Sequence, residues 1–245
     1  MGGTVYTVGQ FVRQMNDFNP TDKIWRYMSF TKFISLLFEQ ALYFARSDTF
    51  NDKREGLPPL TNSQRAMAEL SKSPDHILSA HSQAIEDDLA WLRERTFISC
   101  WNISDDESYT MWQSYGSQEQ GVAIQTTVER LNEEIETTNS DLPLSGKVQY
   151  LDHRFDEMPS KLKVLYFFQK RTYFAAEQEF RVVLFDPKSE RYRRQKYGVY
   201  SPVNILELIE RVYVPPLAND WYVRTVNGVL KQFNFEHIPV CRSGI

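Results

Sequence analysis

The sequence predicts an α+β fold: a single domain with a mixed, largely antiparallel sheet and flanking helices. Short apolar segments rich in β-branched and aromatic residues recur along the chain, which is typical of buried strands. Helical segments separate them irregularly, without the regular βαβ alternation that a parallel sheet requires. The chain has 245 residues, of which 42% are hydrophobic, so it can bury a substantial core.

The N-terminal region is predicted to contain two strands joined by one helix. A first helix over residues 7–18 ends at Asn19-Pro20, because proline cannot continue a helix. The segments 23–28 and 41–45 are predicted to form strands. Between them, residues 30–39 carry apolar side chains at helical spacing behind a serine or threonine that can cap the helix.

The next region is predicted to combine a loop with a helical insert. Residues 47–59 are polar and contain a glycine and two prolines, which is typical of a loop. Residues 61–94 have helical spacing with a break at Ser73-Pro74, so we expect two helices inserted between sheet elements. The segment from Arg95 to Trp101 is predicted to form the following strand. We expect one domain over residues 1–245, with this insert included.

The middle of the chain is predicted to form further helices and strands. The acidic residues 105–107 favour a helix start, since negative charge suits the positive end of a helix dipole, and that helix ends at Gly116. Apolar residues predict strands over 121–126 and 147–151. A polar helix is expected over 128–136.

The C-terminal region is predicted to contain a buried strand, two later strands and two helices. Residues 162–174 are apolar and aromatic and are expected to be helical. The run Phe180–Phe185 is short and rich in β-branched and aromatic residues, as in a buried strand. Two late strands, over 208–214 and 237–241, are expected on either side of a last helix over 221–233.

The composition favours a cytoplasmic protein without a membrane partner. Cys100 and Cys241 are too far apart and too unpatterned for a disulfide framework or a zinc site. Residues 1–10 lack the basic start and apolar centre of a signal peptide. No apolar run approaches the length that spans a membrane.

The net charge of −4 does not attract nucleic acid globally, so such binding needs a local basic patch. The basic run at residues 188–196 is the candidate for such a patch, and a solvated hairpin loop is the alternative. Aromatic residues make up 14% of the chain. Beyond filling cores, they can line pockets for flat ligands.

Two carboxylates stand before the buried strand 180–185. Glu177 and Glu179 are separated by one residue, so on a strand they project to the same side. Paired carboxylates at a pocket can share general acid/base and electrostatic roles. The alternative is that both are solvated strand-end charges that pair with Arg171 or Arg181.

A set of short motifs covers most of the chain. In chain order they are Trp25-Arg26-Tyr27, Leu42-Tyr43-Phe44-Ala45, Phe50-Asn51-Asp52, Phe97-Ile98-Ser99-Cys100-Trp101, Met111-Trp112-Gln113-Ser114-Tyr115-Gly116, Gly121-Val122-Ala123-Ile124, and Lys170 through Glu177-Gln178-Glu179-Phe180-Arg181. Together they resemble the bacterial domain-of-unknown-function family 2971. Lys53 stands where that family usually has proline, and Ala45 stands where it often has serine.

The order of Arg26, a helix, Tyr43 and a late Glu-x-Glu also resembles the site of ADP-ribosyltransferases. That resemblance implies an ADP-ribosyltransferase-like fold and NAD as the substrate, with no metal expected. It implies that Arg26 anchors the dinucleotide, that Tyr43 contacts its nicotinamide half, and that Glu179 holds the nicotinamide ribose. Glu177 would orient the incoming nucleophile. Ser47 and Asn51 complete the expected NAD-binding set.

The chemistry requires a carboxylate at this position. Cleavage of the N-glycosidic bond builds positive charge on the ribose, as in glycoside hydrolysis. A carboxylate bonded to the 2-hydroxyl stabilises that charge most where water is excluded. The resemblance therefore predicts an NAD-dependent ADP-ribosyltransferase-like protein, a candidate bacterial toxin or phage-defence effector, with an unknown protein or nucleic-acid acceptor.

Two other functions remain open at this point. The domain could bind a nucleotide or a protein partner without catalysis, with Arg26 as a structural ion-pair partner of Glu179. It could also be a metal-dependent nuclease in which Asp52 and Glu55 join Glu177 and Glu179 around a divalent cation. Release of nicotinamide from NAD separates the first prediction from both alternatives.

Overall fold

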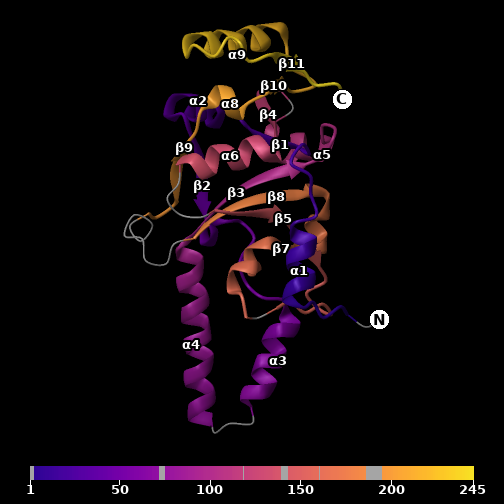
Figure 1. The fold of residues 1–245 in the computed structure, drawn as a ribbon, viewed down its shortest axis with the longest axis vertical. Helices are drawn as coiled ribbons and strands as arrows, with labels where there is room; N and C mark the ends of the chain where they lie inside the picture. Colours follow the sequence, from indigo (N-terminus) through magenta and orange to yellow (C-terminus); the bar gives the residue numbers. More distant parts are fainter. Residues whose placement is uncertain (1–2, 72–74, 118, 139–142, 160, 186–194) are drawn as a thin grey trace.

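The computed structural model describes residues 3–71, 75–117, 119–138, 143–159, 161–185 and 195–245. In these ranges the protein is an α+β molecule with a mixed, largely antiparallel sheet and flanking helices, as predicted (Figure 1). The strands are β1 (Lys23–Ser29), β2 (Ala41–Arg46), β3 (Thr96–Ile103), β4 (Gly121–Thr127), β5 (Leu144–Lys147), β6 (Gln149–Leu151), β7 (Gln169–Arg171), β8 (Glu179–Phe185), β9 (Gly198–Pro202), β10 (Arg211–Val214) and β11 (Val240–Arg242).

The helices differ in type as well as length. The α-helices are α1 (Val8–Met15), α2 (Phe30–Glu39), α3 (Leu60–Leu70), α4 (Asp75–Glu94), α5 (Tyr109–Met111), α6 (Val128–Thr138), α8 (Ile205–Leu208) and α9 (Asp220–Gln232). Three segments are 3₁₀-helices, η1 (Ser47–Thr49), η3 (Lys163–Phe168) and η4 (Thr172–Glu177), and η2 (Trp112–Gly116) is a π-helix. Ser29 caps α2 by accepting a hydrogen bond from the backbone N–H of Lys32.

The large sheet divides at strand β3. One edge of β3 pairs with β8 along its whole length, antiparallel. Its other edge pairs with two strands: with β1 through Asn102 and Ile103, and with β2 through Phe97 and Ile98. The full order is β11-β10-β4-β1-β3-β2-β9, with β8 and β5 continuing from β3. Between these two contacts β1 and β2 separate, and this opening holds the pocket described below.

The side chains of β8 alternate between two different surroundings. Phe180, Val182 and Leu184 belong to the main apolar core, which also contains the apolar faces of α2, α6 and α9. Val183 belongs to a second core together with α1 and η3. The two polar residues on the same side as Val183, Glu179 and Arg181, are also buried. The strand therefore carries buried charges on one face, and the hydrophobic effect alone does not account for the burial of these charged residues.

The helical segment predicted at 61–94 forms α3 and α4, a pair of helices that extends away from the sheet in Figure 1. Most side chains of α3 are exposed, among them Leu60 and Met67. Leu92, near the end of α4, is buried in the second core. The pair is thus attached to the body at its base.

The prediction of one helix over 162–174 was wrong. The segment consists of η3, the short strand β7 and η4. All residues from Leu165 to Lys170 are buried, so the chain passes through the interior here, whereas an amphipathic helix would present a polar face to water. Aromatic residues such as Phe167 and Phe168 also lose rotamer freedom in a helix.

Other boundaries differ from the sequence prediction. The expected helix over 105–115 is reduced to α5 followed by the π-helix η2. The expected strand over 208–214 begins only at Arg211, because α8 ends at Leu208. Strand β9, which pairs with β2, was not predicted. None of the helices in the described ranges combines the length and the hydropathy needed to cross a bilayer.

Candidate functional site

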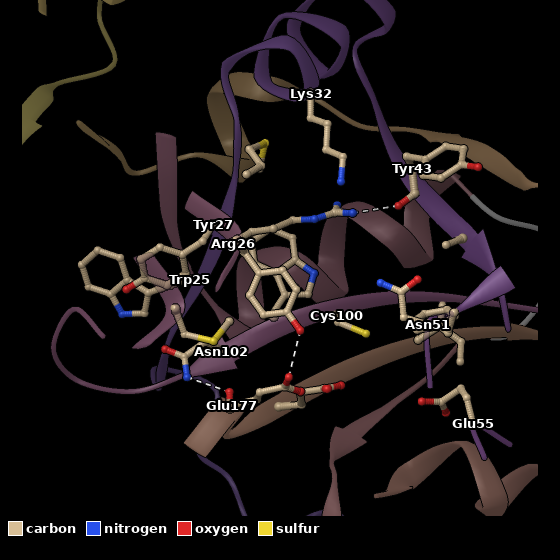
Figure 2. Close-up of a pocket in the computed structure, with 18 of the residues that line it drawn as sticks. Trp25, Arg26, Tyr27, Lys32, Tyr43, Asn51, Glu55, Cys100, Asn102 and Glu177 are labelled. Atoms are coloured by element: carbon tan, nitrogen blue, oxygen red, sulfur yellow. Dashed lines mark hydrogen bonds between the residues drawn. The ribbon is translucent and has the colours of Figure 1, made fainter. Parts of the chain in front are cut away.

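A pocket of about 530 Å³ lies where β1 and β2 separate. Its walls come from β1, α2 and β2 on one side and from η2, η4 and the start of β8 on the other. Figure 2 shows Arg26 and Lys32 at one end and Glu177 at the opposite end. The volume is within the range of about 300–1,000 Å³ that is typical of small-molecule sites.

Five of the six predicted site residues line this pocket: Arg26, Tyr43, Asn51, Glu177 and Glu179. They come from β1, β2, the loop after η1, η4 and β8, so the fold brings distant segments together. Ser47 is not among the lining residues. Its side chain is fully buried and its hydroxyl donates a hydrogen bond of 2.8 Å to the backbone carbonyl of Arg93.

Arg26 connects the two separated strands. Its Nη2 donates a hydrogen bond of 2.9 Å to the backbone carbonyl of Tyr43, and its guanidinium lies 5.6 Å from the ring centroid of Trp101. Burial lowers the pKa of Arg26 to about 10. Neither Arg26 nor Lys32 takes part in the ion pairs formed by the described residues.

The two cations at this end of the pocket point towards the same space in Figure 2. A half-buried guanidinium without a carboxylate partner is suited to an anionic ligand, because Arg pairs strongly with phosphate oxygens. The predicted alternative of an Arg26–Glu179 ion pair is not formed. Glu179 uses other cations, described next.

Glu179 is buried in a network of charges at the opposite end. Its Oε1 accepts a hydrogen bond of 2.7 Å from Lys170 Nζ, and its Oε2 accepts one of 2.5 Å from Arg181 Nε. Arg181 also donates to both carboxylate oxygens of Glu55, at 2.7 and 3.0 Å. Burial alone would raise the pKa of Glu179, but the charges of Arg181 and Lys170 lower it far below its usual value. Glu179 is therefore ionised at neutral pH.

Glu177 is the last residue of the 3₁₀-helix η4. The sequence had predicted it at the start of the following strand. Gln178 has a positive φ of 40° and forms the turn between η4 and β8. The two carboxylates thus meet through a turn, and strand alternation was the wrong reason for their proximity. The Asn102 Nδ2 donates a 2.9 Å hydrogen bond to the backbone carbonyl of Glu177, which fixes this turn to β3.

Both carboxylate oxygens of Glu177 have partners in the pocket wall. Oε1 accepts a hydrogen bond of 2.8 Å from the hydroxyl of Tyr115, and Oε2 accepts one from Lys170 Nζ. Burial and the neighbouring Glu179 raise the pKa of Glu177 above its usual value. Adjacent carboxylates with opposite pKa shifts can take different roles in acid/base chemistry.

Sequence reasoning missed Lys170 and Tyr115 as parts of this site, and it considered Glu55 only as a metal ligand. All three stand in or beside motifs that were recognised, but the motifs alone did not indicate which residues contact the carboxylates. Lys170 precedes Glu177 by seven residues, and this nearby cation is the sequence signal that could have predicted a partner for the carboxylate. Cys100 also lines the pocket, but burial raises the pKa of its thiol, which disfavours the thiolate.

The acidic residues expected for a metal-dependent nuclease are neutralised by cations. Asp52 pairs with Arg171 at 2.9 Å, and Glu55 pairs with Arg181. Within the described ranges, no group of three or more His, Cys, Asp or Glu side chains is arranged to hold a metal ion. Of the predicted basic run at 188–196, residues 188–194 lie outside the part of the chain that the structure describes.

Comparison with known proteins gives one family. No curated protein matches the chain, and no solved structure matches it. Residues 111–182 match the family model described as "Protein of unknown function (DUF2971)", which confirms the predicted resemblance to that family. The matched residues include Tyr115, Lys170, Glu177 and Glu179, so the match covers the segment that builds the acidic end of the pocket.

Proposed function

We propose that this protein is an NAD-dependent ADP-ribosyltransferase-like enzyme with its active site in the pocket between β1 and β2. One observation carries the proposal: Arg26, which forms no ion pair with the described residues, lines the same pocket as Glu177 and Glu179, and Figure 2 shows Arg26 and Glu177 at opposite ends. NAD has matching parts, since its diphosphate is anionic and its nicotinamide ribose becomes cationic during bond cleavage.

In the proposed complex the diphosphate contacts Arg26, and Lys32 lies close enough to add a second positive charge. Tyr43 lines the pocket beside Arg26 and makes an edge contact with Tyr200 at 5.2 Å between ring centroids. The nicotinamide half of NAD rests near this tyrosine. Asn51 is exposed and adds a polar group to the lining of the same pocket.

The proposed reaction breaks the bond between the nicotinamide nitrogen and the anomeric carbon of the ribose. The electron pair leaves with nicotinamide, which departs uncharged, and the ribose becomes an oxocarbenium-like cation. Glu179 accepts a hydrogen bond from the ribose 2-hydroxyl and stabilises this cation. Glu177 orients the hydroxyl or amine of the acceptor and takes its proton as the new bond to the anomeric carbon forms.

Titration calorimetry with NAD tests the proposal, with one series in a chelator and one in excess Mg²⁺. We expect saturable binding of NAD in both series, because Arg26 and Lys32 supply positive charge without a metal. Absence of binding would contradict the proposal. Binding that needs the metal would favour the nuclease alternative.

A non-catalytic nucleotide-binding domain is the second candidate, and one observation favours it. Both oxygens of Glu177 are already occupied, by Tyr115 and Lys170. A protein that binds NAD in the calorimeter yet releases no nicotinamide over many hours would have this function. The acceptor, a toxin or phage-defence role, and a cytoplasmic location remain predictions.

A further inference from the structure

Lys170 is the one side chain that contacts both candidate glutamates in the part of the chain that the structure describes. Its Nζ donates to Glu177 Oε2 and, at 2.7 Å, to Glu179 Oε1. It also lies 4.5 Å from the ring centroid of Phe174. Lys170 is only 8% exposed, so water scarcely competes for these contacts.

We infer that Lys170 is a positioning residue that keeps Glu177 ionised and aligned with Glu179, so that Glu177 can accept a proton near neutral pH. The inference deepens the proposed function and rests on it for the role of Glu177. It does not follow from the family match or from the Glu-x-Glu spacing. It follows from the contacts of one lysine with two carboxylates.

The charge balance of the network shows why Lys170 matters more for Glu177 than for Glu179. Three carboxylates, Glu55, Glu177 and Glu179, share two cations, Lys170 and Arg181. Glu179 would keep Arg181 if Lys170 were neutral. Among the described residues, Glu177 would keep no cation within ion-pair distance, since Tyr115 contributes only a neutral hydroxyl.

The groups that face Glu177 from each neighbouring element act in different directions. Burial and the negative charge of Glu179 on β8 raise its pKa, and Lys170 on β7 lowers it. Tyr115 on η2 stays uncharged, since burial and the Glu177 charge raise the pKa of its phenol. Loss of the Lys170 charge therefore leaves only groups that favour the protonated form of Glu177 or are neutral.

Lys170→Met separates this positioning role from a purely structural one. Methionine keeps the apolar stem beside Phe174 and removes the charge. The carboxyl carbons of ¹³C-labelled glutamates are followed by NMR as a function of pH, and Glu177→Gln assigns the signal of Glu177. We expect the Glu177 midpoint to move to higher pH in Lys170→Met and to return in Lys170→Arg, with Lys231→Met, an exposed lysine on α9, as the unchanged control.

Nicotinamide release provides the second measurement. The acid limb of its pH profile should move to higher pH in Lys170→Met and be restored by Lys170→Arg. An NMR midpoint for Glu177 that stays in place in a folded Lys170→Met protein overturns the inference, whether or not the protein is an enzyme. If the midpoint moves but the wild-type protein releases no nicotinamide, Lys170 controls the ionisation of Glu177 and the proposed function is wrong. If Lys170→Met does not fold, an unaltered Glu177 midpoint in Lys170→Gln has the same meaning.

Discussion

Arg26 is the residue whose surroundings most directly suggest a bound anion. We expect Arg26→Met to weaken NAD binding by about 10–100-fold, because a hydrogen bond to a charged group contributes roughly 1.5–3 kcal/mol. Arg224→Met is the matched control, since Arg224 is exposed on α9, away from the pocket. Calorimetry on both variants makes the comparison. Equal affinities for NAD in the two variants would remove Arg26 from the binding site.

Some site residues could be predicted from the order in which they follow one another along the chain. Arg26, Tyr43 and Glu179 stand on strands that the sequence indicates, and they line one pocket. Lys170 could not be predicted in the same way. Its role depends on the turn at Gln178 and on the path of η4. Together they bring the side chain of Glu177 within hydrogen-bond distance of Lys170 on β7.

At the scale of elements, the buried Arg181 connects β8 to two other segments. It pairs with Glu55 in the loop after η1 and donates a 2.6 Å hydrogen bond to the backbone carbonyl of Phe167 in η3. We expect Arg181→Met to lower the free energy of unfolding by about 3–5 kcal/mol, because it leaves Glu55 buried without its partner. Urea unfolding followed by circular dichroism measures this loss.

The control for this prediction is an exposed ion pair on the same molecule. Arg154 pairs with Asp152 at 2.7 Å, but the arginine side chain is 64% exposed. Arg154→Met should lower the free energy of unfolding by less than about 1 kcal/mol, as is usual for surface pairs. Similar losses in the two variants would mean that the buried network does not hold β8 in place.

Elements were predictable where residue type and periodicity agree. The strands near 23–28, 41–45 and 180–185 are rich in β-branched or aromatic residues, and the structure has β1, β2 and β8 there. The segment 162–174 shares that composition, yet it forms two 3₁₀-helices and a short strand. Its middle, from Leu165 to Lys170, is buried by tertiary contacts, which the local pattern does not encode.

At the scale of the whole molecule, buried His153 should make stability depend on pH. Its Nε2 lies 2.5 Å from Gln169 Oε1, and because Gln169 donates its own amide to the Leu57 carbonyl, the Nε2 of His153 is the donor in this hydrogen bond. Burial, followed by the charges of Arg54 and Arg171, lowers the pKa of His153 despite this hydrogen bond.

The sign of the effect follows from proton binding. Below about pH 6.5, the ordinary histidine value, the unfolded chain binds a proton at this position that the folded chain excludes. The free energy of unfolding should therefore fall as the pH drops from 7 towards 5.5. This slope should be smaller in His153→Gln and unchanged in His237→Gln, where the histidine is exposed. Urea titrations at several pH values measure it, and a wild-type slope in His153→Gln would exclude His153 as the source.

The arrangement of the whole sheet was beyond what the sequence could predict. The α+β class follows from the irregular order of strands and helices. The separation of β1 from β2 does not follow from the sequence, because it arises where one edge of β3 pairs with β1 at one end and with β2 at the other. That separation creates the pocket, so the site could be anticipated as a set of residues but not as a cavity.

Nicotinamide release from NAD, measured by chromatography in the presence of a chelator, tests the central claim most directly. The comparison is between the wild-type protein and Glu179→Gln, which keeps the shape of the side chain and leaves Arg181 paired with Glu55. We expect release by the wild type and a loss of about 100–1,000-fold in the variant, with both proteins folded by circular dichroism. No release by the wild type, or equal release by both, would contradict the assignment of this pocket as the active site of an ADP-ribosyltransferase-like enzyme.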